Sequence, residues 1–167
     1  MIKKGYLDLN FLKNFHENID YEIHKNPNSG FSCIDLKDNN RYIKENLNVY
    51  VSRNIPVQII SFFKEQFSWL DNHEFSVQLM KPGMILPLHS DRYTFYKKKY
   101  KIDINKIERV IVFLGDWSIG HLLHIDTIQI QKWVAGNWVS WQGDTHHLAA
   151  NLGHKNRYTL QITGTKK

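Results

Sequence analysis

From residue 74 to the C-terminus, short apolar segments alternate with turn residues, and this pattern most limits the folds open to the chain. The segments cover residues 75–80, 85–89, 107–115, 121–134, 138–141, 146–151 and 157–164, and a turn near Asp126 divides the fourth. Short apolar runs bounded by turn residues are typical of antiparallel strands. About eight strands suffice for the two four-stranded sheets of a jelly roll, so the sequence predicts a mainly β fold of that type.

The preceding 73 residues are expected to be a helical and irregular segment that covers the β core. Apolar residues at helical spacing, Leu9, Leu12, Phe15 and Ile19, predict an amphipathic helix over residues 9–23. Residues 26–30, NPNSG, form a turn cluster, and residues 31–36, FSCIDL, are an expected strand entering the sheet.

A second helix is predicted over residues 57–70, where apolar residues again recur at helical spacing. Asn54 can cap its start, Pro56 suits the first turn, and Asp71 and Asn72 end it. We expect this helix to pack across the back of a sheet. With 167 residues, 42% of them hydrophobic, the chain fits a single domain, with a covering segment at 1–73 and the β core at 74–167.

The composition of the chain limits its expected cellular location and its expected binding partners. No run approaches the ~20 apolar residues of a membrane span, and the N-terminus lacks a secretory h-region, so a cytoplasmic protein without membrane attachment is expected. A single cysteine, Cys33, excludes an internal disulfide and a multi-thiolate metal site, so a metal would need histidine and carboxylate ligands. The net charge of +6 is scattered except for lysines within residues 97–101, which indicates nucleic acid only weakly.

A metal-binding pattern lies at the end of the second expected strand, after the Pro-Gly turn at residues 81–84. His89 and Asp91 are two residues apart, a spacing that directs both side chains to one face of extended backbone. They supply half of a facial site of two histidines and one carboxylate, which needs a third ligand from a returning strand. His124 and Asp126 repeat the spacing, but too few strands separate that pair from the downstream histidines, so we favour His89 and Asp91.

The segment HSD at 89–91 and the segment WVAGNWVSWQGDTHHLAANLGHKNRYTLQITG at 133–164 resemble the double-stranded β-helix core of the 2-oxoglutarate and Fe(II) dependent oxygenases. The likeness is to small microbial and phage members, and more distantly to aspartyl/asparaginyl β-hydroxylases. It implies a cupin-like jelly roll in which His89, Asp91 and His147 hold Fe(II). Alignment from Trp133 selects His147, and strand periodicity places His146 on the opposite face.

The resemblance also implies a binding site for the cosubstrate. Arg157 and Thr159 match the residues that hold the far carboxylate of 2-oxoglutarate, and a guanidinium fork suits a carboxylate. Arg109 and His121 resemble polar residues that flank the cosubstrate, although a structural role is open for each. Residues 92–106 are expected to be either a lid over the site or a solvated loop.

The expected activity is hydroxylation of an unactivated C–H bond of a small molecule or of a peptide or protein side chain. O2 is consumed, and succinate and CO2 are released. Halogenating relatives have a small residue in place of Asp91, so a hydroxylase rather than a halogenase is implied. The resemblance does not favour nucleic acid as the substrate, because alkylation-repair relatives carry a second closely spaced arginine and none accompanies Arg157. The alternative is a cupin-like metal or small-ligand binding protein without oxygenase activity, which would not need a buried arginine. Neither the substrate nor the oligomeric state follows from the sequence.

Overall fold

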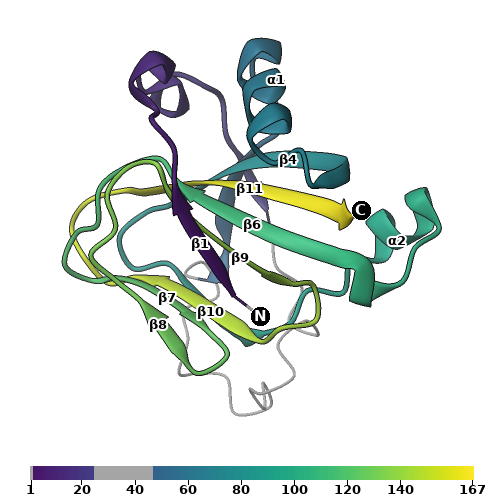
Figure 1. The fold of residues 1–167 in the computed structure, drawn as a ribbon. Helices are drawn as coiled ribbons and strands as arrows, with labels where there is room; N and C mark the ends of the chain where they lie inside the picture. The colour runs from purple at the N-terminus through teal and green to yellow at the C-terminus, as the bar shows by residue number, and fades with distance from the viewer. Residues whose placement is uncertain (1, 25–46) are drawn as a thin grey trace.

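The computed structural model in Figure 1 describes residues 2–24 and 47–167. The turn cluster predicted at 26–30 and the strand predicted at 31–36 lie outside these residues. Among the described residues, no helix has the length and apolar character that a membrane span requires.

Two antiparallel sheets form the molecule (Figure 1). The strands are β1 (Lys3–Tyr6), β2 (Glu22–His24), β3 (Val49–Ser52), β4 (Leu70–Met80), β5 (Ile85–His89), β6 (Ile107–Phe113), β7 (His121–Ile125), β8 (Ile128–Ile130), β9 (Asn137–Gln142), β10 (His147–Asn151) and β11 (Arg157–Lys166). The larger sheet has the order β1-β9-β6-β11-β4-β3-β2, and the smaller has the order β5-β10-β7-β8. The eight strands from β4 onward form a double-stranded β-helix, which confirms the predicted fold class.

The larger sheet is covered on both faces. Successive side chains of its strands point alternately to the helix-covered back and to the space between the two sheets. On β11, Leu160 and Ile162 face the back, where they contact a cluster that includes Phe63 of α1 (Val57–Gln66). This arrangement confirms that the second predicted helix packs across a sheet. Arg157 and Thr159, which precede them at odd-numbered positions, face the space between the sheets, as the two-residue period of a strand requires.

The first predicted helix is wrong as a continuous element. Residues 9–23 instead contain two short 3-10 helices, Asn10–Leu12 and Phe15–Glu17, and Glu22 begins β2. Lys13 and Asn14 between them have positive φ angles of 44° and 53°, a backbone conformation that ends a right-handed helix. The apolar residues still pack against the α1 cluster, so their periodicity indicated burial without an α-helix. The N-terminal third also adds β1, β2 and β3 to the edges of the larger sheet.

The predicted end of the second helix and a predicted hairpin also need correction. α1 ends at Gln66, and Leu70 already belongs to β4, which pairs with β11 and β3. The dipeptide Gly136-Asn137 is a turn signal that predicts a hairpin, but this turn does not close one, because β8 pairs with β7 whereas β9 pairs with β1 and β6. Gly136, with φ at +92°, lets the chain pass from the smaller sheet to the larger one.

Residues 92–106 contain α2 (Thr94–Tyr100) and the 3-10 helix Ile104–Lys106. Tyr96 docks α2 onto the larger sheet by donating a hydrogen bond to the backbone oxygen of Asn72, 2.8 Å away. Its hydroxyl is also 3.1 Å from Oγ1 of Thr165. The segment is therefore a packed helix that lines one side of the cavity between the sheets, rather than a solvated loop.

Candidate metal centre

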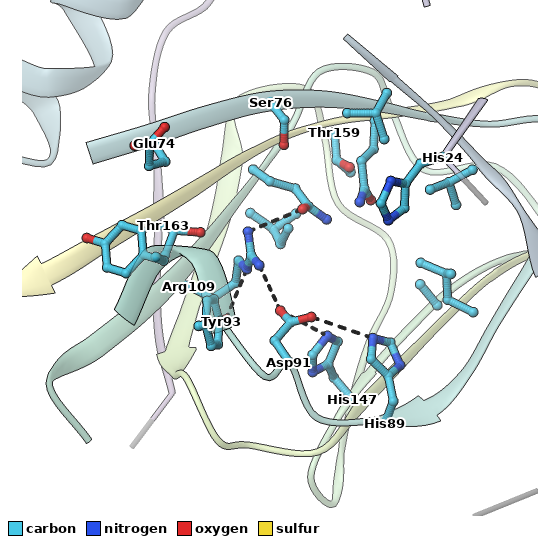
Figure 2. A pocket seen from close by; sticks show the side chains of 18 of the residues that line it. His24, Glu74, Ser76, His89, Asp91, Tyr93, Arg109, His147, Thr159 and Thr163 are labelled. Carbon is cyan, nitrogen blue, oxygen red and sulfur yellow. Dashed lines mark hydrogen bonds and ion pairs between the residues drawn. The ribbon is translucent and has the colours of Figure 1, made fainter. Parts of the chain in front are cut away.

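Two strands of the smaller sheet place the first two candidate ligands side by side. His89 ends β5 and His147 begins β10, and the two residues are direct partners in the antiparallel register. Asp91 follows β5 and turns its carboxylate toward both rings, with Oδ1 3.9 Å from Nε2 of His89 and Oδ2 3.9 Å from Nε2 of His147 (Figure 2). The candidate ligand atoms of the three residues all lie within 4.8 Å of one another.

Backbone carbonyl groups orient both imidazole rings. Nδ1 of His89 lies 2.6 Å from the oxygen of Pro87, and Nδ1 of His147 lies 3.0 Å from the oxygen of Thr145. Because a carbonyl oxygen only accepts hydrogen bonds, each Nδ1 carries the proton and each Nε2 presents its lone pair toward Asp91. Burial lowers the pKa of His147 to about 4, so this ring is neutral near pH 7 and can bind a cation.

A buried network holds the carboxylate. Nη2 of Arg109, on β6, donates to Oδ2 of Asp91 at 2.7 Å, and Nε of Arg109 donates to the Tyr93 hydroxyl at 3.2 Å. Burial alone would raise the pKa of Asp91, but the charge of Arg109 and the hydrogen bond that it donates hold this pKa well below the usual range. Burial raises the pKa of Tyr93, which keeps its hydroxyl protonated. Arg109, for which both a place beside the cosubstrate and a structural role were open, lies against Asp91 and lines the same cavity.

The three residues open onto a cavity of about 690 Å³ between the two sheets, within the range of small-molecule sites. On the larger sheet, β4 and β11 present polar residues to the cavity at alternate positions. These residues are Glu74, Ser76, Gln78, Thr159, Gln161 and Thr163. The floor formed by the smaller sheet beyond the histidines is apolar and contains Leu86, Leu123 and Ala149. Figure 2 shows the histidines and Asp91 opposite Ser76 and Thr159.

Arg157 lines the same cavity and is only 4% exposed. Its guanidinium lies 5.6 Å from the ring centre of Trp133, and Nη1 lies 2.9 Å from Sδ of Met80. Within residues 2–24 and 47–167 it forms no salt bridge, and its Nε has no hydrogen-bond partner. Burial lowers the pKa of Arg157 to about 10, so the group is still charged at neutral pH. A buried charge without a counterion is costly, and an anionic ligand would relieve that cost.

Other residues considered from the sequence lie away from the cavity wall. His121 is buried on β7, where Nδ1 accepts a hydrogen bond from the Ser118 amide and Nε2 lies 3.1 Å from the oxygen of Lys155. His121 is not among the cavity-lining residues, so its position gives no support for a direct cosubstrate contact. His146 is exposed, and Nδ1 of His124 contacts the backbone oxygen of Asp126. Neither pairs with Asp91.

Gln161 is a cavity residue that sequence reasoning missed, although it continues the two-residue period that starts with Arg157 and Thr159. Trp141 also lines the cavity, and its ring centre lies 5.1 Å from that of His147. Tyr93 lies in an irregular connection, and its contact with Arg109 arises from tertiary packing that no periodic signal predicts.

No protein-family model matches the sequence, and no curated protein matches it. Solved structures do match. A prolyl-4-hydroxylase from Pseudomonas putida has a TM-score of 0.52 and 18% identity over 71% of this chain and 72% of that chain. A 2OG-Fe(II) oxygenase family oxidoreductase from Burkholderia pseudomallei has a TM-score of 0.51 and 13% identity over 72% of this chain and 67% of that chain. A cupin protein from Bacteroides fragilis scores 0.41, with 18% identity over 57% of this chain and 68% of that chain. At these identities the likeness establishes the fold and leaves the activity to the site.

Proposed function

We propose that the protein is an Fe(II)- and 2-oxoglutarate-dependent oxygenase that hydroxylates a C–H bond of a small molecule or of a peptide or protein side chain. The observation that carries this proposal is the buried, unpaired guanidinium of Arg157 in the cavity that also holds His89, Asp91 and His147. A metal-binding cupin without cosubstrate has no use for such a charge.

The donor set fits Fe(II). Two imidazoles that present Nε2 and one ionised carboxylate match the two-histidine, one-carboxylate facial set of non-haem iron oxygenases. His89, Asp91 and His147 would hold the ion from one side and leave its other positions open to the cavity. Bound Fe(II) would supply the redox chemistry with O2 and 2-oxoglutarate, which yields succinate, CO2 and one oxygen atom for the substrate.

The cavity between the histidines and Arg157 suits a dicarboxylate. Strand β10 runs from His147 to Asn151, whose Nδ2 donates at 2.8 Å to the oxygen of Met80, the register partner of Arg157. The four residue steps from His147 to Asn151 span roughly 13 Å, which a five-carbon diacid and an arginine side chain can bridge together. Arg157 and Thr159 would bind the far carboxylate, while the apolar floor would contact the methylene groups.

The opposite end of the cavity is the side on which a substrate would enter. Glu74 and Thr163 line that end together with residues of α2. Asp91 completes the protein ligand set and leaves no protein-derived gap for halide, so we propose hydroxylation rather than chlorination. The polar side chains that β4 and β11 present to the cavity would orient the substrate by hydrogen bonds.

The test is anaerobic reconstitution with Fe(II) followed by titration with 2-oxoglutarate. We expect the weak visible charge-transfer band of the chelate, and we expect His147→Ala to abolish it because one ligand is lost. His146→Ala is the matched control and should keep the band, since His146 is exposed and does not pair with Asp91. Iron-loaded, folded protein that fails to bind 2-oxoglutarate would instead favour the cupin-like alternative. A band that survives in His147→Ala and disappears in His146→Ala would refute the ligand assignment.

A further inference from the structure

Arg109 contacts Asp91, the candidate metal ligand that lies outside the strands. Its three guanidinium nitrogens are each committed: Nη2 to Oδ2 of Asp91 at 2.7 Å, Nε to the Tyr93 hydroxyl at 3.2 Å, and Nη1 to Oε1 of Gln161 at 3.3 Å. Figure 2 shows the guanidinium between Asp91 and the wall of the larger sheet. Three contacts in different directions fix the plane of the fork, which a single lysine amine would not achieve.

Asp91 itself has little support from regular structure. It lies after the end of β5 and before α2, so its backbone belongs to no sheet or helix. Tyr93, two residues later, has a φ of 49°, an uncommon conformation for a residue with a side chain. The Tyr93 hydroxyl accepts a hydrogen bond at 3.2 Å from Nε of Arg109, the same guanidinium that holds the Asp91 carboxylate. Arg109 and Tyr93 therefore supply the orientation that β5 and β10 supply for the two histidines.

We propose that Arg109 is a positioning residue that keeps Oδ2 of Asp91 occupied, so that the carboxylate binds the metal through Oδ1 alone. This inference rests on the proposed function, because it needs a metal at His89, Asp91 and His147. Tyr93 and Gln161 hold Arg109 in place and contribute through it. The role goes beyond simple charge balance, since a carboxylate with one reserved oxygen leaves an additional coordination position open to ligands.

The sign of the effect on metal affinity separates this role from a purely electrostatic one. A buried guanidinium repels a nearby divalent cation, so removing its charge would tighten metal binding if charge were all that mattered. Removing an orienting partner of a metal ligand weakens binding, typically by about 10–100-fold. The proposal requires the second result.

The experiment is titration of metal-free protein with Co(II), followed by its visible spectrum, for the wild type, Arg109→Met, Arg109→Lys and Tyr93→Phe. We expect Arg109→Met to weaken Co(II) binding by about 10–100-fold. Arg109→Lys should recover part of the loss, and Tyr93→Phe should give a smaller loss in the same direction. The Co(II) bands should also change in Arg109→Met, because the released Oδ2 can join the coordination shell. Unchanged or tighter binding in both Arg109→Met and Tyr93→Phe would overturn the proposal.

Two further comparisons identify the route of the effect. Lys99→Met removes another cavity-lining cation, one that pairs with Glu74 instead of Asp91, and should leave Co(II) affinity unchanged. In an Asp91→Asn background, Arg109→Met should weaken Co(II) binding much less than in the wild type, because the carboxylate that Arg109 positions is gone. An equal cost in both backgrounds would contradict the proposal, as would normal Co(II) binding combined with lost 2-oxoglutarate binding in Arg109→Met. Wild-type protein that binds no Co(II) would instead refute the metal centre of the proposed function.

Discussion

Arg109 and Arg157 are two guanidinium groups that line one cavity, and they differ in how their charge is balanced. Arg109 is paired with Asp91 at 2.7 Å, so its charge is neutralised within the protein. Arg157 forms no salt bridge in the part of the chain that the structure describes, and only the Trp133 ring and Met80 sulfur contact its guanidinium. The first arginine is arranged to orient a protein group, and the second is arranged to receive an anion.

Arg157→Met should separate ligand binding from stability. We expect 2-oxoglutarate affinity to fall at least about 30-fold, because losing one partner of a buried charge pair costs about 2–5 kcal/mol. Without ligand, the free energy of unfolding should stay the same or rise, since the substitution removes an uncompensated buried charge. Calorimetric titration and urea unfolding measure the two effects. A large loss of stability with intact 2-oxoglutarate binding would show that Arg157 is a structural residue.

At the scale of the element, α2 and the Gly136 turn show how irregular connections become part of the site. α2 is held by Tyr96, which is 8% exposed, whereas the neighbouring Phe95 is 90% exposed. The side chains of both residues line the cavity, so the docking of α2 sets the shape of its open end. The Gly136 turn places β9, and therefore Trp141, on the inner face of the larger sheet beside His147.

Tyr96→Phe tests the docking of α2. The substitution removes one hydroxyl that bonds to Asn72 and contacts Thr165, so we expect a loss of about 1 kcal/mol in the free energy of unfolding. Amide hydrogen exchange within residues 94–100 should accelerate. Phe95→Ala is the control and should change stability by less than about 0.5 kcal/mol. Equal effects of the two substitutions would show that the hydroxyl does not hold the helix.

Gly136→Ala tests the crossing between the sheets. A Cβ atom at Gly136 would lie 2.0 Å from the backbone oxygen of Leu7, and the φ of +92° is unfavourable for alanine. We expect destabilisation of at least about 1–3 kcal/mol, because the strained backbone must shift β1 away from β9. At Gly115 a Cβ would meet nothing within 4 Å, so Gly115→Ala should be tolerated. Urea unfolding of the two variants provides the comparison, and equal stabilities would contradict the assigned role of the turn.

At the scale of the whole molecule, burial of histidines links stability to pH. Burial lowers the pKa of both His16 and His121 below the ordinary histidine value of 6.5, so the unfolded chain binds more protons than the folded chain just below that pH. Their contribution to stability is intact above pH 6.5 and is lost as the pH falls through the lowered folded-state pKa values. These two residues lie on different parts of the fold, so the effect belongs to the molecule as a whole.

The melting temperature of metal-free protein should therefore fall between pH 7 and pH 5, measured in the presence of a chelator. His16→Gln should flatten part of this decline, because glutamine does not titrate. The exposed His146 offers a control, and His146→Gln should keep the wild-type slope. A melting temperature that stays constant down to pH 5 would contradict the expected linkage.

The sequence by itself determined the β core and the residues that its periodicity aligns. Alternation along a strand depends only on neighbouring residues, so it placed His146 and His147 on opposite faces and Arg157 and Thr159 on one face, while the family resemblance selected His147 as the inward residue. Helical spacing near Leu12 also predicted burial correctly, although the backbone at Lys13 and Asn14 interrupts the helix. Local pattern reports which side chains are covered more reliably than it reports the hydrogen bonding of the backbone.

Only the tertiary structure decided which distant groups meet. Which sheet β9 joins, where Arg109 directs its guanidinium, and which histidine is left outside the cavity all depend on contacts between residues far apart in the chain. Arg109 and His121 look alike in the sequence, because each is a polar residue in an apolar strand. In the structure, Arg109 forms a salt bridge with Asp91, whereas His121 contacts the backbone oxygen of Lys155. No local periodicity encodes that difference, because it arises from how two twisted sheets pack against each other.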